Sequence, residues 1–438
     1  MGDGARASRV RETIDSGGFD KTFSRLYWPE RDSILAQRDR YRDAIQAFTE
    51  NYGGDRDIAI YSVPGRVEIC GNHTDHNNGI VMAAAVNLDI IAVVARSESG
   101  VIRVRSKNFG EDVVSLSDMK PDSAEFGSSS AMIRGVTAGI AERGGRVGGF
   151  DAYTTSDVLK GSGLSSSAAF EICVGTIMNG EYNDGRFSAV EIGQIGQYAE
   201  NIFFGKPSGL MDQISCSVGG AVSIDLKDLS KPLVRRIPFD LSSYGMKLVV
   251  TDTKGDHADL TEEYSAIRDE MEQVARFFGK KNLREVNRDD FYLHIADIRR
   301  EAGDRSVLRA AHFFEECGRV GGAIDAIGSC DIARFLSIIT ECGNSSFEYN
   351  QNAYCIKTPT RQGVPVALAI SQVILSGRGA WRLQGGGFAG TIQAFVPDDL
   401  LFEYCCALRG IFGEDACHVL RVREDGPLNF IKTLRRAT

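Results

Sequence analysis

The sequence lacks a long apolar run. Its longest uninterrupted apolar stretches, 80–86 and 90–95, are far shorter than the roughly 18 residues that a membrane-spanning helix needs. The first 20 residues are polar and contain no apolar core, so we expect no secretory leader. Basic blocks are missing as well, and the net charge is −9. Because an acidic chain binds nucleic acid and anionic membranes poorly, we expect neither as a partner.

A cysteine framework is also missing. The chain has ten cysteines, but no Cys-x-x-Cys pair occurs and none stands at zinc-site spacing with a histidine pair. Most of the cysteines lie among apolar neighbours, as small buried side chains do. Because disulfides persist mainly in oxidising compartments, we predict reduced thiols in a cytoplasmic protein.

Glycine, in contrast, is abundant, with 48 glycines among 438 residues, and the glycines cluster. The length suits two or three domains of roughly 150 residues each. Strand-like and helix-like patterns occur in both halves, which predicts α/β or α+β layers. We place a domain boundary near residue 235 and expect residues 1–25 to form a loosely ordered tail.

Hydrophobic periodicity predicts the elements that carry the glycine clusters. Helices are expected at 29–50, 132–143, 188–204, 260–278, 299–317 and 332–350. Strands are expected at 58–63, 81–95, 101–106, 221–226, 247–252 and 391–396, with a turn at Pro64 and Gly65 after the first of them.

The first cluster is Pro64-Gly-Arg-Val-Glu-Ile-Cys-Gly-Asn-His-Thr-Asp-His-Asn-Asn-Gly79. It gathers six hydrogen-bonding side chains beside a strand: Arg66, Glu68, Asn72, His73, Asp75 and His76. Such a density suits a polyol, whose hydroxyls both donate and accept hydrogen bonds. A polar turn capped by Asp and Asn is the alternative.

Two further clusters favour close approach of the backbone to a ligand. Lys160-Gly-Ser-Gly-Leu-Ser-Ser-Ser-Ala-Ala169 opens a helix, where amide N–H groups form an anion site and a serine can ligate Mg²⁺. Gln384-Gly-Gly-Gly-Phe-Ala-Gly390 lies between two strands. The alternatives are a tightly packed helix of small residues for the former and a flexible turn for the latter.

In this order and spacing the three clusters resemble the GHMP small-molecule kinases and, among them, the galactokinases. Gly205-Lys-Pro-Ser-Gly-Leu-Met-Asp-Gln213 is similar to the galactokinase segment that bears the catalytic aspartate, and Glu263-Tyr264 with Arg268 matches another family feature. The resemblance implies a two-domain α+β fold. Residues 1–235 would form a ribosomal-protein-S5-like domain, residues 236–438 would form a ferredoxin-like domain, and the active site would lie between them.

The resemblance also implies the reaction, which is transfer of the ATP γ-phosphoryl group to the anomeric hydroxyl of galactose. Asp212 would be the catalytic base, with Arg66 beside it. Mg²⁺ would be held by Glu200 and a serine of the 165–167 run, with Ser167 favoured for the metal and Ser166 for a phosphate oxygen. The sugar would be bound by Asn72, His73, Asp75, Tyr264 and Gly209. The ATP phosphates would be bound by Gly161, Ser162, Gly163, Leu164, Ser165, Ser166, Ser167 and Ala168, with support from the 385–390 turn. The expected partners are thus a small sugar and ATP, and the expected state is a monomer or weak homodimer.

Four positions depart from the galactokinase pattern. The family usually has Asn at position 68, Glu at 72, Tyr at 76 and Gly at 389, where this chain has Glu68, Asn72, His76 and Ala389. The usual Glu at position 72 accepts from the C6 hydroxyl of the sugar. Asn72 could still bind a hydroxyl, donate to a carboxylate or accommodate an altered C6. A kinase for N-acetylgalactosamine, arabinose or a hexuronate is therefore one alternative. A catalytically silent sensor that binds galactose and ATP is another.

Overall fold

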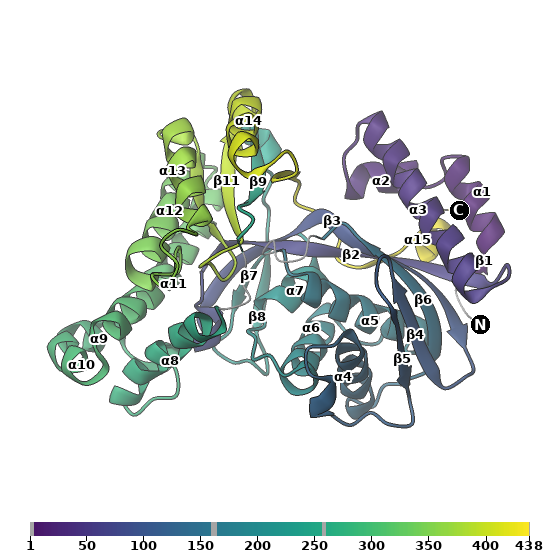
Figure 1. The fold of residues 1–438 in the computed structure, drawn as a ribbon, viewed down its shortest axis with the longest axis horizontal. Coiled ribbons are helices and arrows are strands. Elements are labelled where there is room, and N and C mark those ends of the chain that lie inside the picture. The colour runs from purple at the N-terminus through teal and green to yellow at the C-terminus, as the bar shows by residue number, and fades with distance from the viewer. Residues whose placement is uncertain (1–3, 159–163, 256–259, 438) are drawn as a thin grey trace.

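The computed structural model describes residues 4–158, 164–255 and 260–437, and it is built on two β-sheets (Figure 1). The first sheet has the strand order β1-β2-β3-β6-β4-β5, and β7, β8 and β13 pair beside this path. Its strands are β1 (Ala5–Arg6), β2 (Asp57–Cys70), β3 (Ile80–Ser97), β4 (Val101–Ser106), β5 (Glu111–Ser115), β6 (Gly149–Ser156), β7 (Ala221–Asp225), β8 (Leu233–Ile237) and β13 (Leu428–Asn429). All of its ladders are antiparallel except the one between β4 and β6.

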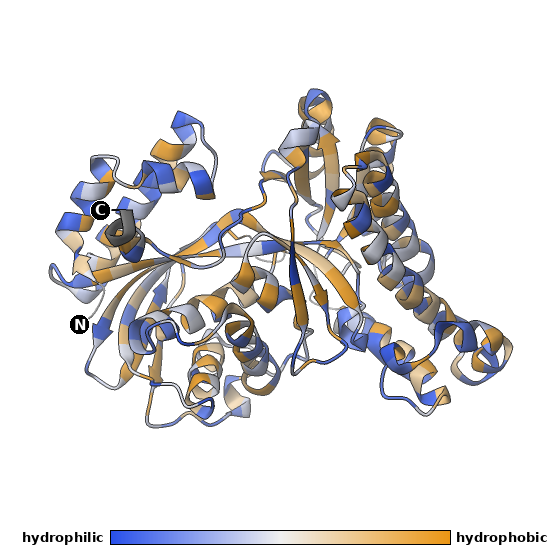
Figure 2. Ribbon diagram, turned by 180° about the vertical axis from the view of Figure 1, so that it is seen from behind, coloured by the Kyte–Doolittle hydropathy of each residue, from blue (hydrophilic) through white to orange (hydrophobic). Residues whose placement is uncertain are grey.

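Helices cover both faces of this sheet because its two long strands, β2 and β3, are apolar on both sides. One face carries α4 (Ser129–Glu142), α5 (Ser166–Tyr182), α6 (Ala189–Tyr198) and α7 (Met211–Val218), while α3 (Arg31–Tyr52) packs on the other (Figure 1). The strands are mainly orange in Figure 2 and the helices around them alternate between orange and blue, as amphipathic helices do.

The second sheet is antiparallel, in the order β10-β11-β9-β12. Its strands are β9 (Met246–Asp252), β10 (Ala380–Gln384), β11 (Thr391–Pro397) and β12 (Cys417–Leu420). Side chains alternate along β9, so that Leu248 and Val250 face α12 (Ile332–Ser345) while Val249 faces α13 (Gly363–Leu375) and α14 (Leu401–Phe412). The two sheets and their mixed helices confirm the α+β class.

The remaining helices of the second half extend from this sheet on one side (Figure 1). They are α8 (Thr261–Phe277), α9 (Arg288–Leu293), α10 (Ile295–Ala302) and α11 (Asp304–Gly328). The helix expected at 299–317 is divided, because Gly303 has a left-handed φ of 86° and α11 begins directly after it. Two other expected helices end in π-helical turns, Ala199–Phe204 after α6 and Ser346–Asn350 after α12.

The expected turn at Pro64 and Gly65 is wrong. Strand β2 continues through both residues and takes a β-bulge there, with Pro64 opposite Asp89 and Arg66 opposite Ala85. A bulge lets a strand keep its pairing while it changes the direction of one side chain. The side chain that follows this bulge belongs to Arg66.

The expectation of a loose N-terminal tail is also wrong. Residues 7–26 form α1 (Ala7–Asp15) and α2 (Asp20–Leu26), and Phe19 and Phe23 are fully buried. Both phenylalanine rings pack against Phe430, which begins α15 (Phe430–Ala437) at the other end of the chain. An aromatic cluster therefore holds both ends of the chain on the first sheet.

The boundary near residue 235 stays a prediction. It lies within β8, after which the chain enters the second sheet at β9. The last residues do not stay with the second sheet, because β13 pairs with β2. Within the described residues, no helix is both long and apolar enough to cross a membrane.

Candidate active site

Asp212 lies in the first turn of α7 and is held from two sides. From the bulged part of β2, Arg66 donates to Oδ1 through both Nε and Nη2, at 2.7 Å each. The hydroxyl of Ser165 donates to the other oxygen, Oδ2. Arg66 is nearly fully buried, while the Asp212 side chain is 32% exposed. The carboxylate is therefore fixed in orientation and still accessible.

The charge of Asp212 follows from these contacts. Burial alone would raise the pKa of the carboxyl, but the Arg66 guanidinium and the Ser165 hydroxyl outweigh it and hold the pKa below its ordinary value. Asp212 is thus ionised at neutral pH. An ionised carboxylate whose lone pairs point to a partly open position can accept a proton from a hydroxyl placed there.

Local backbone geometry brings Ser165 to Asp212. The Leu164 carbonyl accepts from the Arg66 amide at 3.3 Å, and a Cβ at Gly65 would lie 3.0 Å from that carbonyl oxygen. Ser165 then takes a left-handed φ of 56° at the start of α5 and uses its hydroxyl for Asp212 instead of capping the helix. Left-handed φ at a non-glycine residue is strained and is often found at functional sites.

The described part of the predicted phosphate loop begins at Leu164. Gly161, Ser162 and Gly163 lie outside the described residues, and Leu164 is buried. Ser166, Ser167 and Ala168 form the first turn of α5, where backbone N–H groups have no partner within the helix. These N–H groups and the helix dipole favour an anion, so the start of α5 suits phosphate oxygens.

Glu200 stands in the π-helical turn after α6 and is buried. Its Oε1 accepts from the Ser167 hydroxyl at 3.4 Å and from Lys206 Nζ at 3.0 Å, and its Oε2 accepts from Gln213 at 2.8 Å. Glu200 and Ser167 are thus adjacent, and their role as Mg²⁺ ligands stays a prediction. A carboxylate next to a hydroxyl suits Mg²⁺, which prefers hard oxygen ligands and keeps several waters. Lys206 is paired with this carboxylate, and its side chain is 60% exposed.

Asp75 and Gly209 meet directly. Asp75 begins a short 3-10 turn just after residues 71–73, which we call the signature loop, and a Cβ at Gly209 would overlap its carboxylate. Only glycine therefore allows this approach. Because Gly209 stands three residues before Asp212, the contact places the predicted sugar-binding signature next to the segment that carries the predicted base.

His73 and Tyr264 both contact the glycine-rich turn 385–390. His73 Nε2 donates to the Gly386 carbonyl at 2.9 Å, and Tyr264 on α8 donates to the Gly387 carbonyl at 2.8 Å. Burial and the neighbouring His76 lower the pKa of His73 to about 3, so its ring is neutral. With its proton on Nε2, the ring keeps Nδ1 as an acceptor, which is what a sugar hydroxyl needs.

The 385–390 turn keeps its shape with alanine at position 389. Gly387, Phe388 and Gly390 take left-handed φ angles of 83°, 58° and 85°, whereas Ala389 does not. The departure from glycine at position 389 therefore costs no backbone strain. Support of the phosphate loop by this turn stays a prediction, because the contacts of the turn described above are with the sugar-binding signature and α8.

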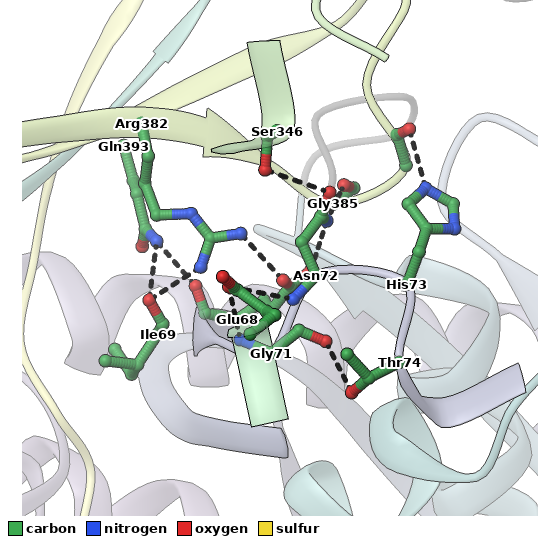
Figure 3. A network of polar contacts seen from close by, with 12 residues as sticks. Glu68, Ile69, Gly71, Asn72, His73, Thr74, Ser346, Arg382, Gly385 and Gln393 are labelled. Carbon is green, nitrogen blue, oxygen red and sulfur yellow. Dashed lines mark hydrogen bonds and ion pairs between the residues drawn. The ribbon is translucent and has the colours of Figure 1, made fainter. Parts of the chain in front are cut away.

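Asn72 is placed differently from the other predicted sugar ligands. Its side chain is 1% exposed and lies among polar groups of both halves of the chain (Figure 3). The Nδ2 group donates to the Gly385 carbonyl at 2.8 Å and to Glu68 at 3.2 Å. His76, another departure from the family pattern, stacks on His73 with ring centroids 6.0 Å apart.

Sequence patterns did not reveal two buried residues beside Glu200. Gln213 donates to both Glu200 and Glu171, and burial and the charge of Glu200 raise the pKa of Glu171 well above its ordinary value. Glu171 stands four residues after Ser167 on α5, so helical spacing alone could have placed both on one face. Gln213 follows Asp212 at the end of the segment 205–213, and the sequence pattern assigns it no role.

Known proteins match this chain in two regions and over most of its length. Residues 46–96 match the galactokinase galactose-binding signature, and residues 131–220 match the N-terminal domain of the GHMP kinases. A galactokinase of Streptomyces coelicolor is 32% identical over 356 residues, which cover 80% of this chain and 87% of the relative. A galactokinase of Actinobacillus pleuropneumoniae is 32% identical over 358 residues, which cover 81% of this chain and 89% of that relative.

Solved structures show the same fold. The crystal structure of a Lactococcus lactis galactokinase complexed with galactose superposes with a TM-score of 0.76 at 21% identity, covering 88% of this chain and 98% of that one. A mevalonate kinase of Methanococcus jannaschii superposes with a TM-score of 0.58 at 15% identity, and the superposition covers 83% of this chain and 98% of that one. The two-domain fold expected from the motifs is therefore confirmed.

Proposed function

This chain belongs to the galactokinase family, and we propose that it transfers the γ-phosphoryl group of ATP to the anomeric hydroxyl of galactose, giving galactose 1-phosphate and ADP. The observation that carries this proposal is the cluster of Arg66, Asp212 and Ser165. It provides an ionised, oriented carboxylate between the start of α5 and the sugar-binding signature.

Asp212 acts as the base in this proposal. The anomeric hydroxyl must lose its proton as its oxygen attacks phosphorus, and Asp212 accepts that proton at Oδ2, which has a second lone pair besides the one that Ser165 uses. Arg66 keeps the carboxylate ionised before the transfer. Its positive charge also stabilises the negative charge of the phosphoryl group during the transfer.

The sugar lies beside the signature loop and the 385–390 turn, which contact each other directly. Asp75 accepts from sugar hydroxyls, neutral His73 accepts at Nδ1, and Tyr264 borders the site from α8. Gly209 leaves room for the Asp75 carboxylate.

The phosphates of ATP lie at the start of α5. The N–H groups of Ser166, Ser167 and Ala168 bind their oxygens, together with the loop 161–165 before them. Ser167 and Glu200 would hold Mg²⁺, which neutralises phosphate charge when bound. The cytoplasmic location and the monomeric or weakly dimeric state stay predictions.

A kinase for another sugar is the second candidate. The observation that favours it is the burial of Asn72, because the position that usually contacts the C6 hydroxyl in galactokinases makes its hydrogen bonds within the protein here. N-acetylgalactosamine, arabinose and hexuronates are the sugars to compare with galactose.

The variant Asp212→Asn tests the proposal. It keeps the shape of the side chain and removes the proton acceptor, so ADP release with galactose should fall by at least about a thousandfold. Galactose and ATP binding, measured by calorimetry, should stay within about tenfold of the wild type. Near-normal turnover in Asp212→Asn would remove Asp212 from the role of base. Wild-type protein that binds galactose without releasing ADP would show a sensor instead.

A further inference from the structure

The side chain of Asn72 forms four hydrogen bonds within the protein (Figure 3). Its Nδ2 group donates to the Gly385 carbonyl at 2.8 Å and to Glu68 Oε2 at 3.2 Å. Its Oδ1 accepts from Asn352 Nδ2 at 2.8 Å and from the Ser346 hydroxyl at 3.4 Å. A side-chain amide has two N–H donors and two oxygen lone pairs, so these four contacts use its whole capacity.

Relative to the galactokinase pattern, Asn and Glu have exchanged places at positions 68 and 72. Glu68, like Asn72, contacts the second half of the chain. Glu68 and Arg382 form an ion pair at 2.8 Å, with side chains only 2% and 0% exposed. Arg382 also donates to the Ile69 carbonyl at 2.7 Å. A buried guanidinium requires such an anionic partner, because an unpaired buried charge costs several kcal/mol.

The backbone around Asn72 is held as well. Glu316 on α11 accepts from the amides of Gly71 at 3.0 Å and Asn72 at 3.4 Å. His312, one turn earlier, donates to the Asn72 carbonyl at 2.9 Å. Burial alone would raise the pKa of Glu316, but His312, Arg319 and Arg382 lower it to about 2, so the acceptor of both amides stays charged.

We propose that Asn72 is a positioning residue that fixes the signature loop 71–73 against the glycine-rich turn 385–387, and that it does not bind the sugar. Through this connection, His73 is placed where it can accept from the sugar while it donates to Gly386. The inference deepens the proposed function and rests on it.

The exchange at positions 68 and 72 fits this role. A carboxylate at position 72 would face the Gly385 carbonyl and the Glu68 carboxylate, neither of which can donate a hydrogen bond. An amide at position 68 would leave Arg382 without its buried anion. The two residues therefore suit their positions together: the Glu68 carboxylate forms the ion pair with Arg382, and the Asn72 amide donates to the Gly385 carbonyl and to Glu68.

The test is the nearly isosteric variant Asn72→Asp, measured with galactose and with 6-deoxygalactose, which lacks the C6 hydroxyl. The affinity for 6-deoxygalactose is measured with this sugar either as a substrate or as a competitive inhibitor of galactose phosphorylation. A positioning residue affects both sugars, so we expect the affinity for each to fall at least about tenfold while their ratio stays within about twofold. A ratio that changes more than about fivefold would show that residue 72 touches the C6 hydroxyl and would overturn the inference. Unchanged affinity for both sugars would overturn it too.

Asn183→Asp is the matched control. Asn183 is also buried, and its Nδ2 donates to the carbonyls of Arg146 at 2.8 Å and Met178 at 3.0 Å, outside the candidate site. The Asn183→Asp variant should be less stable than the wild type and keep the affinity of the wild type for both sugars. If Asn72→Asp does not fold, Asn352→Ala removes one donor to Asn72 and leaves the Glu68–Arg382 pair intact, with the same expected ratio.

Hydrogen exchange separates this inference from the proposed function. In Asn72→Asp, amides of both 71–73 and 385–388 should exchange faster than in the wild type, with or without sugar. Protection that is unchanged in 385–388 would contradict a connection through Asn72. Wild-type protein that fails to phosphorylate galactose would contradict only the proposed function, because this readout needs no turnover.

Discussion

Burial and two neighbouring groups act on the pKa of the Asp212 carboxyl in opposite directions. Burial would raise its pKa and reduce its charge at neutral pH, while Arg66 and Ser165 lower the pKa. The lowering outweighs the effect of burial because Arg66 makes two contacts to one oxygen at 2.7 Å. The result is a weak base in a fixed position, which suits proton transfer that accompanies phosphoryl transfer.

The variant Arg66→Gln should move the acid limb of the pH profile. Activity requires ionised Asp212, so kcat/KM falls as the pH drops through the pKa of this residue. Without the guanidinium, burial dominates and the pKa rises, and the limb should move to higher pH by roughly 1 to 3 units. The measurement is kcat/KM for galactose against pH. A limb that stays in place would show that Arg66 does not control the charge of Asp212.

The control for this prediction is Arg288→Gln. Arg288 pairs with Glu315 and is 53% exposed, and neither residue belongs to the candidate site. Its removal should leave both the pH profile and the rate unchanged, since exposed ion pairs contribute little.

At the scale of residues, the sequence predicts which side chains belong to the candidate site better than it predicts how each one is oriented. Asp212, Arg66, Ser165 and Glu200 are recognisable from motifs, and the structure brings them together. The orientation of Asn72 is not recognisable, because its partners Asn352 and Gly385 stand 280 and 313 residues further along the chain, and no motif links them to it.

Among the elements, β2 contributes most to the site. One strand carries the bulge before Arg66 and ends at Cys70, where the signature loop begins. The sequence favours a turn at Pro64 and Gly65, because this dipeptide commonly interrupts strands. Pairing with β3 on one side, which resumes at Arg66, keeps the strand intact. Tertiary pairing therefore overrides the local preference.

Gly209, in the segment before α7, leaves room for the Asp75 carboxylate. In Gly209→Ala the new Cβ would overlap the Asp75 carboxylate, which must then turn away from its present position. Because Asp75 is proposed to bind the sugar and not the reacting phosphoryl group, KM for galactose should rise by about tenfold or more while kcat changes less. Steady-state kinetics over a range of galactose concentrations measures both.

Gly110→Ala is the matched control for Gly209→Ala. A Cβ at Gly110 meets no atom within 4 Å, so the added methyl group should change neither constant. If Gly209→Ala also leaves KM unchanged, Asp75 does not contribute to sugar binding.

At the scale of the whole molecule, the ends of the chain stabilise the first sheet. Phe23 lies within 4.9 Å of the Tyr41 ring and 5.7 Å of the Phe430 ring, measured between centroids. The sequence of residues 1–25 is polar on average and does not show this burial. Its aromatic residues bury only because α3 and α15 offer a matching apolar surface.

Phe23→Ala should therefore lower the free energy of unfolding by about 3–5 kcal/mol, the usual cost of removing a large buried aromatic side chain. Urea unfolding of the variant measures this change, with Lys21→Ala on the exposed side of α2 as the control. A change below about 1 kcal/mol would show that the segment is loosely attached after all.

The two-domain arrangement is the part of the molecule that motifs predict best. Three glycine-rich clusters in a fixed order imply the fold, and the superposed kinases confirm it. The polar network between the two halves is the part they predict least, since Arg382, Glu316 and Asn352 come from segments without a recognisable pattern.

The most direct test of the central claim is a competition in one tube. Equal amounts of galactose, glucose, N-acetylgalactosamine, arabinose and galacturonate are incubated with limiting Mg-ATP, and the products are identified by phosphorus and carbon NMR. Galactose 1-phosphate as the main product, with its phosphate on the anomeric carbon, is the result we predict. A 1-phosphate of another sugar as the main product, or a phosphate on another carbon, would contradict a galactose 1-kinase.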